Sequence, residues 1–307
     1  MRVDQEDMNC QSLDKNASQN CIHPELKGKV SDSVSKVKEV PPRLSVESLL
    51  EQSPTWFTKV DAVNKDKDKS GLDVLDALDP SIFQKISDVY EFLLESCGDL
   101  SREVLQYLHE RGISSETAEK MRLAYISDYG DLCESLTERF PQYLLEWSGL
   151  VNHKANLRFY KHRLVFPFVM ECRVVYLQAR SLDERVKPQE INLDRPVPCP
   201  FNTDVIKQDD VKRVYLCEGV IDALSLTDRG LPAVGIPDYR YFRRKWLRFF
   251  FGKDVFILSR WDKPGFSPVD YVHRLFLRAR FPSKIVVVPS GVDLSSYSEV
   301  LQHMKMD

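Results

Sequence analysis

The stretch VYLCEGVID, residues 214–222, and the stretch VFILSRWDKPG, residues 255–265, decide the fold of this chain. Each is a short apolar run that ends abruptly in charged residues close to a glycine, as a buried parallel strand does where it leaves its sheet. In open α/β sheets, ligands bind at this edge. Two strands that bring acidic residues to one edge predict a divalent-cation site for handling phosphates. In the second stretch, however, Arg260 stands where a metal-binding carboxylate would be expected.

The residues around these stretches alternate between strand and helix patterns. Four strands with intervening helices in about ninety residues predict a compact parallel α/β domain. The strands are expected at residues 211–217, 232–236, 255–259 and 284–289, and the helices at residues 220–228, 241–251, 269–280 and 296–303.

The first half of the chain divides into a polar arm and a helical segment. Residues 1–80 have weak hydrophobic periodicity and many charged residues, so we expect a mostly disordered arm. From residue 81, apolar residues recur at helical spacing. Ser101 and Ser115 are placed to begin helices, and Pro141 is placed to interrupt one near residues 131–145.

Between the helical segment and the parallel sheet, the pattern is that of paired strands. Residues 162–170 and 173–181 read as two strands joined by a turn at Glu171 and Cys172. Residues 184–200 are rich in proline and are expected to be irregular. The predicted architecture is therefore α/β, with a helical N-terminal subdomain at 81–207 and a parallel-sheet domain at 208–307.

Composition limits the class of protein. The seven cysteines lack C-x-x-C spacing, which favours reduced thiols over a disulfide framework, and Cys10, Cys21 and His23 lack a fourth zinc ligand. The N-terminus has no signal-peptide pattern and the apolar runs are too short to span a membrane, so a cytoplasmic protein is expected. Residues 151–307 carry 26 basic and 18 acidic side chains, a net charge of +8, which favours a polyanionic partner.

An ordered series of motifs across residues 82–304 resembles the RNA polymerase core of bacterial DNA primases of the DnaG type, including its TOPRIM domain. The series covers some two-thirds of the chain, and its order makes it more specific than any single motif. The motifs are YLHERGIS (107–114), SETAEKMRLAYI (115–126), RLVFPF (163–168), YLQAR (176–180), INL (191–193), PFN (200–202) and EGVIDAL (218–224).

The resemblance implies a Mg²⁺ or Mn²⁺ site, in which Glu218 would be catalytic. The expected ligands are Glu218, Asp222, Asp262 and Asp293. Glu218 before a glycine at a strand end is hard to explain structurally. Asp222 could instead be a solvent-facing helix residue, Asp262 an ordinary loop acid, and Asp293 a helix cap.

Basic residues provide the predicted surface for nucleic acid or nucleotide. Lys154, Arg158, Lys161 and Arg163 lie within ten residues that contain no acid and are interleaved with Phe159 and Tyr160, a mixture suited to single strands. The resemblance adds three positions to this set, Arg180, Lys187 and Asn202, and Arg260 joins them as a residue that departs from the family pattern but could contact phosphate. The basic residues at 240–248 read better as a solvated helix face.

Two departures from the primase pattern concern the metal site. Arg260-Trp261-Asp262 replaces an Asp-x-Asp motif, and Ser295 replaces a second acid after Asp293. Arg260 either contacts substrate phosphate directly or marks a decayed site, and either way we expect weakened cation binding.

The resemblance implies a primase of DNA replication that acts on a single-stranded DNA template with ribonucleoside triphosphates. We expect no zinc module and no helicase-binding module in this reduced protein, so a helicase or another replication factor would be a separate partner. The competing hypotheses are a non-catalytic single-stranded DNA-binding adaptor and a TOPRIM nuclease.

Overall fold

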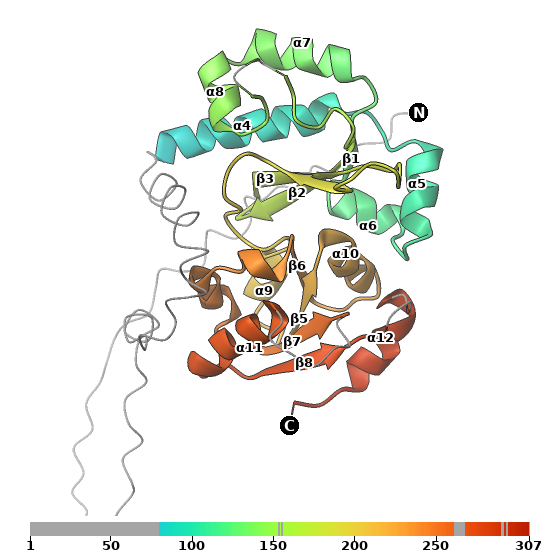
Figure 1. Ribbon diagram of the computed structural model, residues 1–307, viewed down its shortest axis with the longest axis vertical. Coiled ribbons are helices and arrows are strands. Elements are labelled where there is room, and N and C mark those ends of the chain that lie inside the picture. Colours follow the sequence, from blue (N-terminus) through green and yellow to red (C-terminus); the bar gives the residue numbers. More distant parts are fainter. Residues whose placement is uncertain are drawn as a thin grey trace, which may run out of the picture. The chain divides into compact units, whose positions relative to one another are not determined.

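The computed structural model describes residues 80–152, 154, 156–260, 268–289, 292 and 294–306. Apart from Pro80, which begins a helix, the predicted arm lies outside these residues, and so do Cys10, Cys21 and His23. Within the described part, the strands form two sheets of four strands each (Figure 1). The α/β class predicted from the sequence is therefore confirmed.

Five helices of the described chain precede or flank the first sheet. Ser101 caps one of them by accepting a hydrogen bond from the Val104 amide, as the sequence predicts, whereas the next is capped by Ser114, one residue earlier than expected. Pro141 separates the last two, as predicted. These helices are α4 (Pro80–Ser96), α5 (Arg102–His109), α6 (Ser115–Lys120), α7 (Tyr129–Arg139) and α8 (Gln142–Trp147).

The first sheet is antiparallel, in the order β1-β2-β3-β4, and α4 packs against β3. Glu171 and Cys172 form the predicted turn, with φ of 56° and 61°. The expectation that residues 184–200 are wholly irregular is wrong, because a short polar strand there pairs with β3. Such a strand is defined by its partner and carries little hydrophobic pattern of its own. The strands are β1 (Ala124–Tyr125), β2 (Leu164–Met170), β3 (Arg173–Arg180) and β4 (Glu190–Asn192).

The second sheet is parallel throughout, in the order β6-β5-β7-β8, as the alternating pattern predicts. The strands β5, β6 and β7 are buried over most of their length, which explains their continuous apolar runs, whereas the edge strand β8 is only partly buried. A short helix, α9 (Asp204–Lys207), precedes the sheet. The strands are β5 (Arg213–Glu218), β6 (Ala233–Ile236), β7 (Asp254–Ser259) and β8 (Ser283–Val287).

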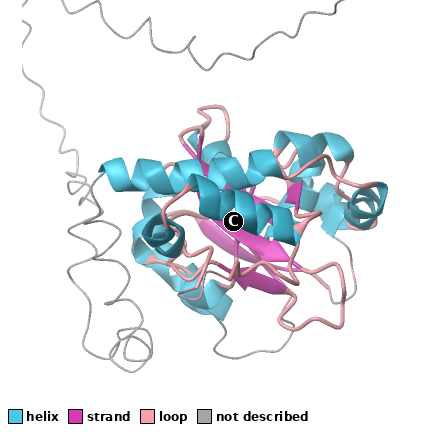
Figure 2. Cartoon of the chain, turned by 90° about the horizontal axis from the view of Figure 1, so that it is seen from above, coloured by secondary structure: helices cyan, strands magenta, loops and turns pink. Residues whose placement is uncertain are grey.

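Helices cover both faces of the parallel sheet. α10 (Val220–Asp228) packs against β5, β6 and α12 (Leu294–His303), whereas α11 (Pro268–Arg278) packs against β7 and β8 from the other side (Figures 1 and 2). The chain leaves β5 toward one face and β7 toward the other. The crevice beyond the carboxyl ends of these two adjacent strands is therefore the switch point at which doubly wound sheets bind ligands.

The prediction of an α-helix over residues 241–251 is wrong. The chain forms two 3₁₀ segments instead, η3 (Tyr239–Tyr241) and η4 (Arg244–Phe250). The reason is tertiary, because Trp246 is fully buried and its indole N–H donates to the Pro198 carbonyl at 3.0 Å. Phe251, which follows η4, is 62% exposed.

Two further expectations concern cysteines and membranes. The cysteines among the described residues are free thiols, as predicted. None of the helices that the structure describes is both long and apolar enough to cross a membrane.

Candidate functional site

Glu218 ends β5 and is exposed at the switch point of the parallel sheet. The next residue, Gly219, turns the chain into α10 with φ of +101°, a conformation that residues with a Cβ rarely adopt. Its amide donates to the Ile236 carbonyl at 2.6 Å. Gly235 lets this turn approach β6 closely, because a Cβ there would lie 2.8 Å from the Gly219 carbonyl oxygen. The two glycines thus fix the direction in which Glu218 leaves the sheet.

Asp222 lies in the first turn of α10 and forms a two-pronged ion pair with Arg260, the residue after β7. Arg260 Nη2 lies 2.9 Å from Asp222 Oδ1, and Nε lies 3.2 Å from Oδ2. Arg260 Nη1 also donates to the Val292 carbonyl at 3.0 Å. The guanidinium therefore links the end of β7 to the first turn of α10 and to the segment before α12. It also neutralises the charge of Asp222, one of the predicted metal ligands.

Asp238 is an acid of this site that the sequence analysis did not assign. Partial desolvation raises the pKa of Glu218 above its ordinary value, and the negative charge of Asp238 raises it further, although Glu218 is exposed. Asp238 caps η3 and forms an ion pair with Arg240. The sequence could have assigned Asp238 to the site, because it lies just after β6. The carboxyl ends of parallel strands meet at one edge of the sheet, so Asp238 is expected near Glu218 at the end of β5.

The 3₁₀ segment η3 packs beneath the same edge of the parallel sheet, through Tyr239. Tyr239 is 2% exposed, and its hydroxyl lies 2.8 Å from the Leu216 carbonyl and 2.5 Å from the Leu258 carbonyl. It therefore bridges β5 and β7 just below Glu218 and Arg260, and it holds the two strand ends in register.

The described residues do not provide a divalent-metal site. They contain no group of three or more histidine, cysteine or acidic side chains that could hold an ion. Asp222 is paired with Arg260, and Asp238 is paired with Arg240. The other two predicted ligands, Asp262 and Asp293, lie outside the described residues. The Mg²⁺ or Mn²⁺ site therefore stays a prediction.

The predicted basic strip, Lys154 to Arg163, divides into two kinds of residue. Lys154 and Lys161 are exposed. Arg158 is half-buried and lies 3.5 Å from Asp194, and Arg163 donates to the Ser127 carbonyl at 2.9 Å. The two lysines are therefore the cations of the strip that are most accessible to a phosphate backbone.

The two aromatic residues of the strip also differ. The interpretation of Phe159 as a stacking surface is wrong, because its side chain is fully buried in the core. Tyr160 is 57% exposed and packs edge-on against Tyr129, so its ring is the one that a base could contact.

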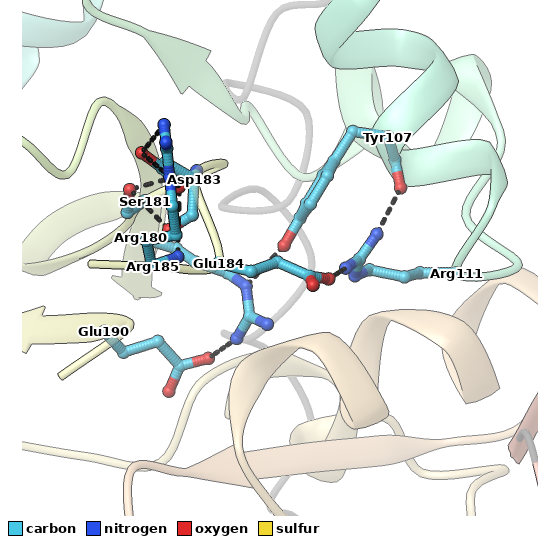
Figure 3. A network of polar contacts seen from close by, with 8 residues as sticks. All are labelled: Tyr107, Arg111, Arg180, Ser181, Asp183, Glu184, Arg185 and Glu190. Atoms are coloured by element: carbon cyan, nitrogen blue, oxygen red, sulfur yellow. Dashed lines mark hydrogen bonds and ion pairs between the residues drawn. The ribbon is translucent and has the colours of Figure 1, made fainter. Parts of the chain in front are cut away.

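Arg180 is held in a network of polar contacts (Figure 3). Its Nε donates to the Tyr107 hydroxyl at 2.6 Å, and its Nη1 pairs with Glu190. Only 15% of the Arg180 side chain is exposed. Desolvation favours its uncharged form, but the Tyr107 and Glu190 contacts outweigh that effect and its pKa is raised. Glu190 was missed because its strand was not predicted.

The remaining two predicted binding residues have different surroundings. Lys187 is exposed in the segment before β4. Asn202 is half-buried with φ of 60°, and its amide donates to the Ala233 carbonyl at 2.9 Å. Asn202 therefore has an internal structural contact, and its predicted nucleotide contact stays untested.

Comparisons with known proteins agree with this architecture. Residues 81–195 match the family model for the DNA primase catalytic core, N-terminal domain. The Gene 57 protein of Mycobacterium phage D29 is 28% identical over 124 residues, which are 40% of this chain and 78% of the phage protein.

Solved primase structures match a larger part of the chain. The DnaG primase catalytic domain bound to single-stranded DNA matches with a TM-score of 0.61 and 16% identity, over 73% of this chain and 78% of that one. The Aquifex aeolicus primase, with zinc-binding and RNA polymerase domains, matches with a TM-score of 0.59 and 22% identity, over 74% of this chain and 61% of that one. The architecture and these matches lead to one conclusion: the chain has the fold of the DnaG primase catalytic core.

Proposed function

We propose that this chain is a DNA-primase-like protein that binds single-stranded DNA and joins ribonucleotides into short RNA primers, with nucleotidyl transfer weakened by Arg260. Residues 81–207 would supply most of the template surface, and residues 208–307 the reacting edge of the TOPRIM sheet. The observation that carries the proposal is the position of Glu218, an exposed carboxylate at the switch point of a primase-core fold.

In this reaction a primer hydroxyl attacks the α-phosphate of a ribonucleoside triphosphate and gives up its proton to solvent. A new P–O bond forms as the bond from the α-phosphorus to the bridging oxygen breaks, and pyrophosphate leaves. Catalysis of this kind depends on positioning and on offsetting negative charge. Arg260 is a cation at the correct edge, and guanidinium binds phosphate well. Its Nε and Nη2 donate to Asp222 in this structure, so a phosphate would compete with that carboxylate for the guanidinium.

The second candidate is a non-catalytic adaptor that binds single-stranded DNA. The Arg260–Asp222 pair favours it, because that pair satisfies an acid that would otherwise attract a cation. The adaptor would bind DNA through the exposed lysines Lys154 and Lys161. It would need no divalent-metal site at the edge of the parallel sheet.

Primer synthesis on single-stranded DNA with labelled ribonucleotides, in Mg²⁺ or Mn²⁺, distinguishes the two. The wild-type chain should make weak product that Glu218→Gln abolishes, because the exposed carboxylate at the sheet edge is lost. Arg260→Asp should raise activity if the site has decayed, since it restores an acid beside Asp222. No product from any of the three chains, with single-strand binding retained, would exclude catalysis and leave the adaptor.

A further inference from the structure

A cavity of about 320 Å³ lies between the β3–β4 ribbon and the segment that follows β6. Its size is at the lower end of the range for small-molecule sites and suits a nucleoside-sized group. One wall comes from the antiparallel sheet and the connection before β4, and the other from the segment that follows β6. The cavity is lined by Gln178, Arg180, Pro188, Gln189, Glu190, Asn192, Pro237, Asp238 and Tyr241.

Strand register places four polar side chains on the same face of this ribbon. Gln178 is paired with Asn192 and Arg180 with Glu190, and residues two apart on a strand share a face. The Arg180 charge is matched by Glu190, as Figure 3 shows. This wall therefore offers a phosphate no uncompensated positive charge, and it suits a neutral polar group better.

This wall offers both acceptors and donors: beside the Glu190 carboxylate, the Asn192 side-chain amide uses only its oxygen in the contact with Gln178. Gln178 is 1% exposed, and its Nε2 donates to Asn192 Oδ1 at 3.2 Å, but its Oε1 has no hydrogen-bond partner. This oxygen is shielded from solvent, so a ligand reaches it only after the Gln178 side chain turns its amide toward the cavity, where a donor would satisfy an atom that is otherwise left unpaired. Glu190 Oε1 accepts from Arg180, whereas no hydrogen bond from the described residues reaches its Oε2.

The opposite wall adds a carboxylate and an aromatic ring. Asp238 lines the cavity, and Tyr241 is 51% exposed beside it. A half-exposed ring at the rim of such a cavity can stack on a flat heterocycle. The ligand that fits both walls is therefore a planar group whose edge carries N–H donors beside an acceptor.

We propose that this cavity holds the guanine base of a nucleotide. Guanine presents two adjacent donors on its pairing edge, N1–H and the 2-amino group. Adenine and cytosine present an amino group beside an unprotonated ring nitrogen, and uracil presents one N–H between two carbonyls. The inference rests on the proposed function for the source of the ligand, and it names Glu190 and Gln178 as the residues that select the base.

Binding of GTP, ITP and ATP to the full chain, measured calorimetrically without template, tests the inference. ITP lacks only the 2-amino group, so GTP should bind about tenfold tighter than ITP, and also tighter than ATP. Glu190→Gln should reduce the GTP-to-ITP ratio of affinities toward one. Tyr241→Ala should weaken all three nucleotides together, whereas Tyr241→Phe should not, because it keeps the ring.

Glu184→Gln is the matched control, since it removes an acid from the same connection, where the side chain is 80% exposed, outside the cavity. It should keep the wild-type ratio. Equal affinity of wild type for GTP and ITP, or an unchanged ratio in Glu190→Gln, overturns the inference. Primer synthesis without any guanine preference refutes only the base pocket, whereas guanine-selective binding without product refutes only the catalysis.

Discussion

Arg260 changes the charge at the carboxyl edge of the parallel sheet, where Glu218 and Asp222 lie. Its position after β7 was readable from the sequence, but its two-pronged pairing with Asp222 was not. Of the four predicted metal ligands, the structure describes only Glu218 and Asp222, and Asp222 is held by a guanidinium. The edge is therefore partly neutralised by the protein's own cation, with 45% of that side chain still exposed to a competing ligand.

Asp228 is the residue for which we expect a pH-dependent effect on stability. Its Oδ1 accepts from the Ser114 amide at 2.7 Å and from the Ser114 hydroxyl at 2.5 Å, which connects α10 to α6. Partial desolvation opposes ionisation, but the hydrogen bonds outweigh it and lower the pKa of Asp228. This contribution is present above the ordinary aspartate pKa of about 3.9 and is lost as the pH falls through the lowered value.

Asp228→Ala should lower the free energy of unfolding by about 1 to 2 kcal/mol at pH 7, measured by urea denaturation. The difference from wild type should shrink below about pH 4, where the carboxylate becomes protonated. Asp209→Ala, which removes an exposed acid, is the control and should change little. A destabilisation that is the same at pH 7 and pH 3 would contradict the assigned role.

At the scale of elements, the helices and strands with their own periodicity were predictable. The four parallel strands and the helices α4, α5 and α10 have buried faces that the apolar spacing reveals. β4 and the 3₁₀ segments were missed because they depend on partners elsewhere in the chain. Glu190 is in a strand only because β3 pairs with it, and η4 is organised around the buried Trp246.

The β2–β3 turn gives a prediction at this scale. Glu171 and Cys172 both have positive φ, as a two-residue type I′ turn requires, and glycine is strongly preferred at the second position. Cys172→Gly should therefore raise the free energy of unfolding by about 0.5 to 1 kcal/mol, because relief of left-handed strain exceeds the added entropy of unfolded glycine.

Urea denaturation of Cys172→Gly beside Cys172→Ala checks this. The alanine variant keeps a Cβ at the same φ and should show no gain. Equal stability of the two variants would mean that the turn is not strained at this position.

At the scale of the whole molecule, charge segregation favours a polyanionic partner for residues 151–307, which carry a net charge of +8. Phe201, in the connection that leads from the antiparallel sheet to the parallel sheet, forms reciprocal backbone hydrogen bonds with Gly235 of β6, at 2.7 and 3.2 Å.

Reversing the exposed charges of the strip tests this electrostatic role. Lys154→Glu with Lys161→Glu should weaken binding to single-stranded DNA about tenfold or more at low salt. The slope of log affinity against log salt should become shallower by about 1 to 2, as measured by fluorescence anisotropy. Both lysines are exposed, so the fold should be retained.

A charge-matched control for the strip replaces exposed lysines elsewhere, Lys85→Glu with Lys212→Glu. It changes the net charge by the same amount and should affect binding much less. Similar losses in both double variants would mean that net charge, and no particular strip, attracts the strand.

The sequence by itself determined which segments are buried strands, where they end, and that Glu218 and Arg260 stand at those ends. Those properties follow from local periodicity and from glycine placement, which one segment carries within itself. Only the tertiary structure decided that Arg260 pairs with Asp222, that Glu190 pairs with Arg180, and that Phe159 is core. Each of these depends on which distant side chain shares the same space, a relation set by strand register and packing that no local pattern encodes.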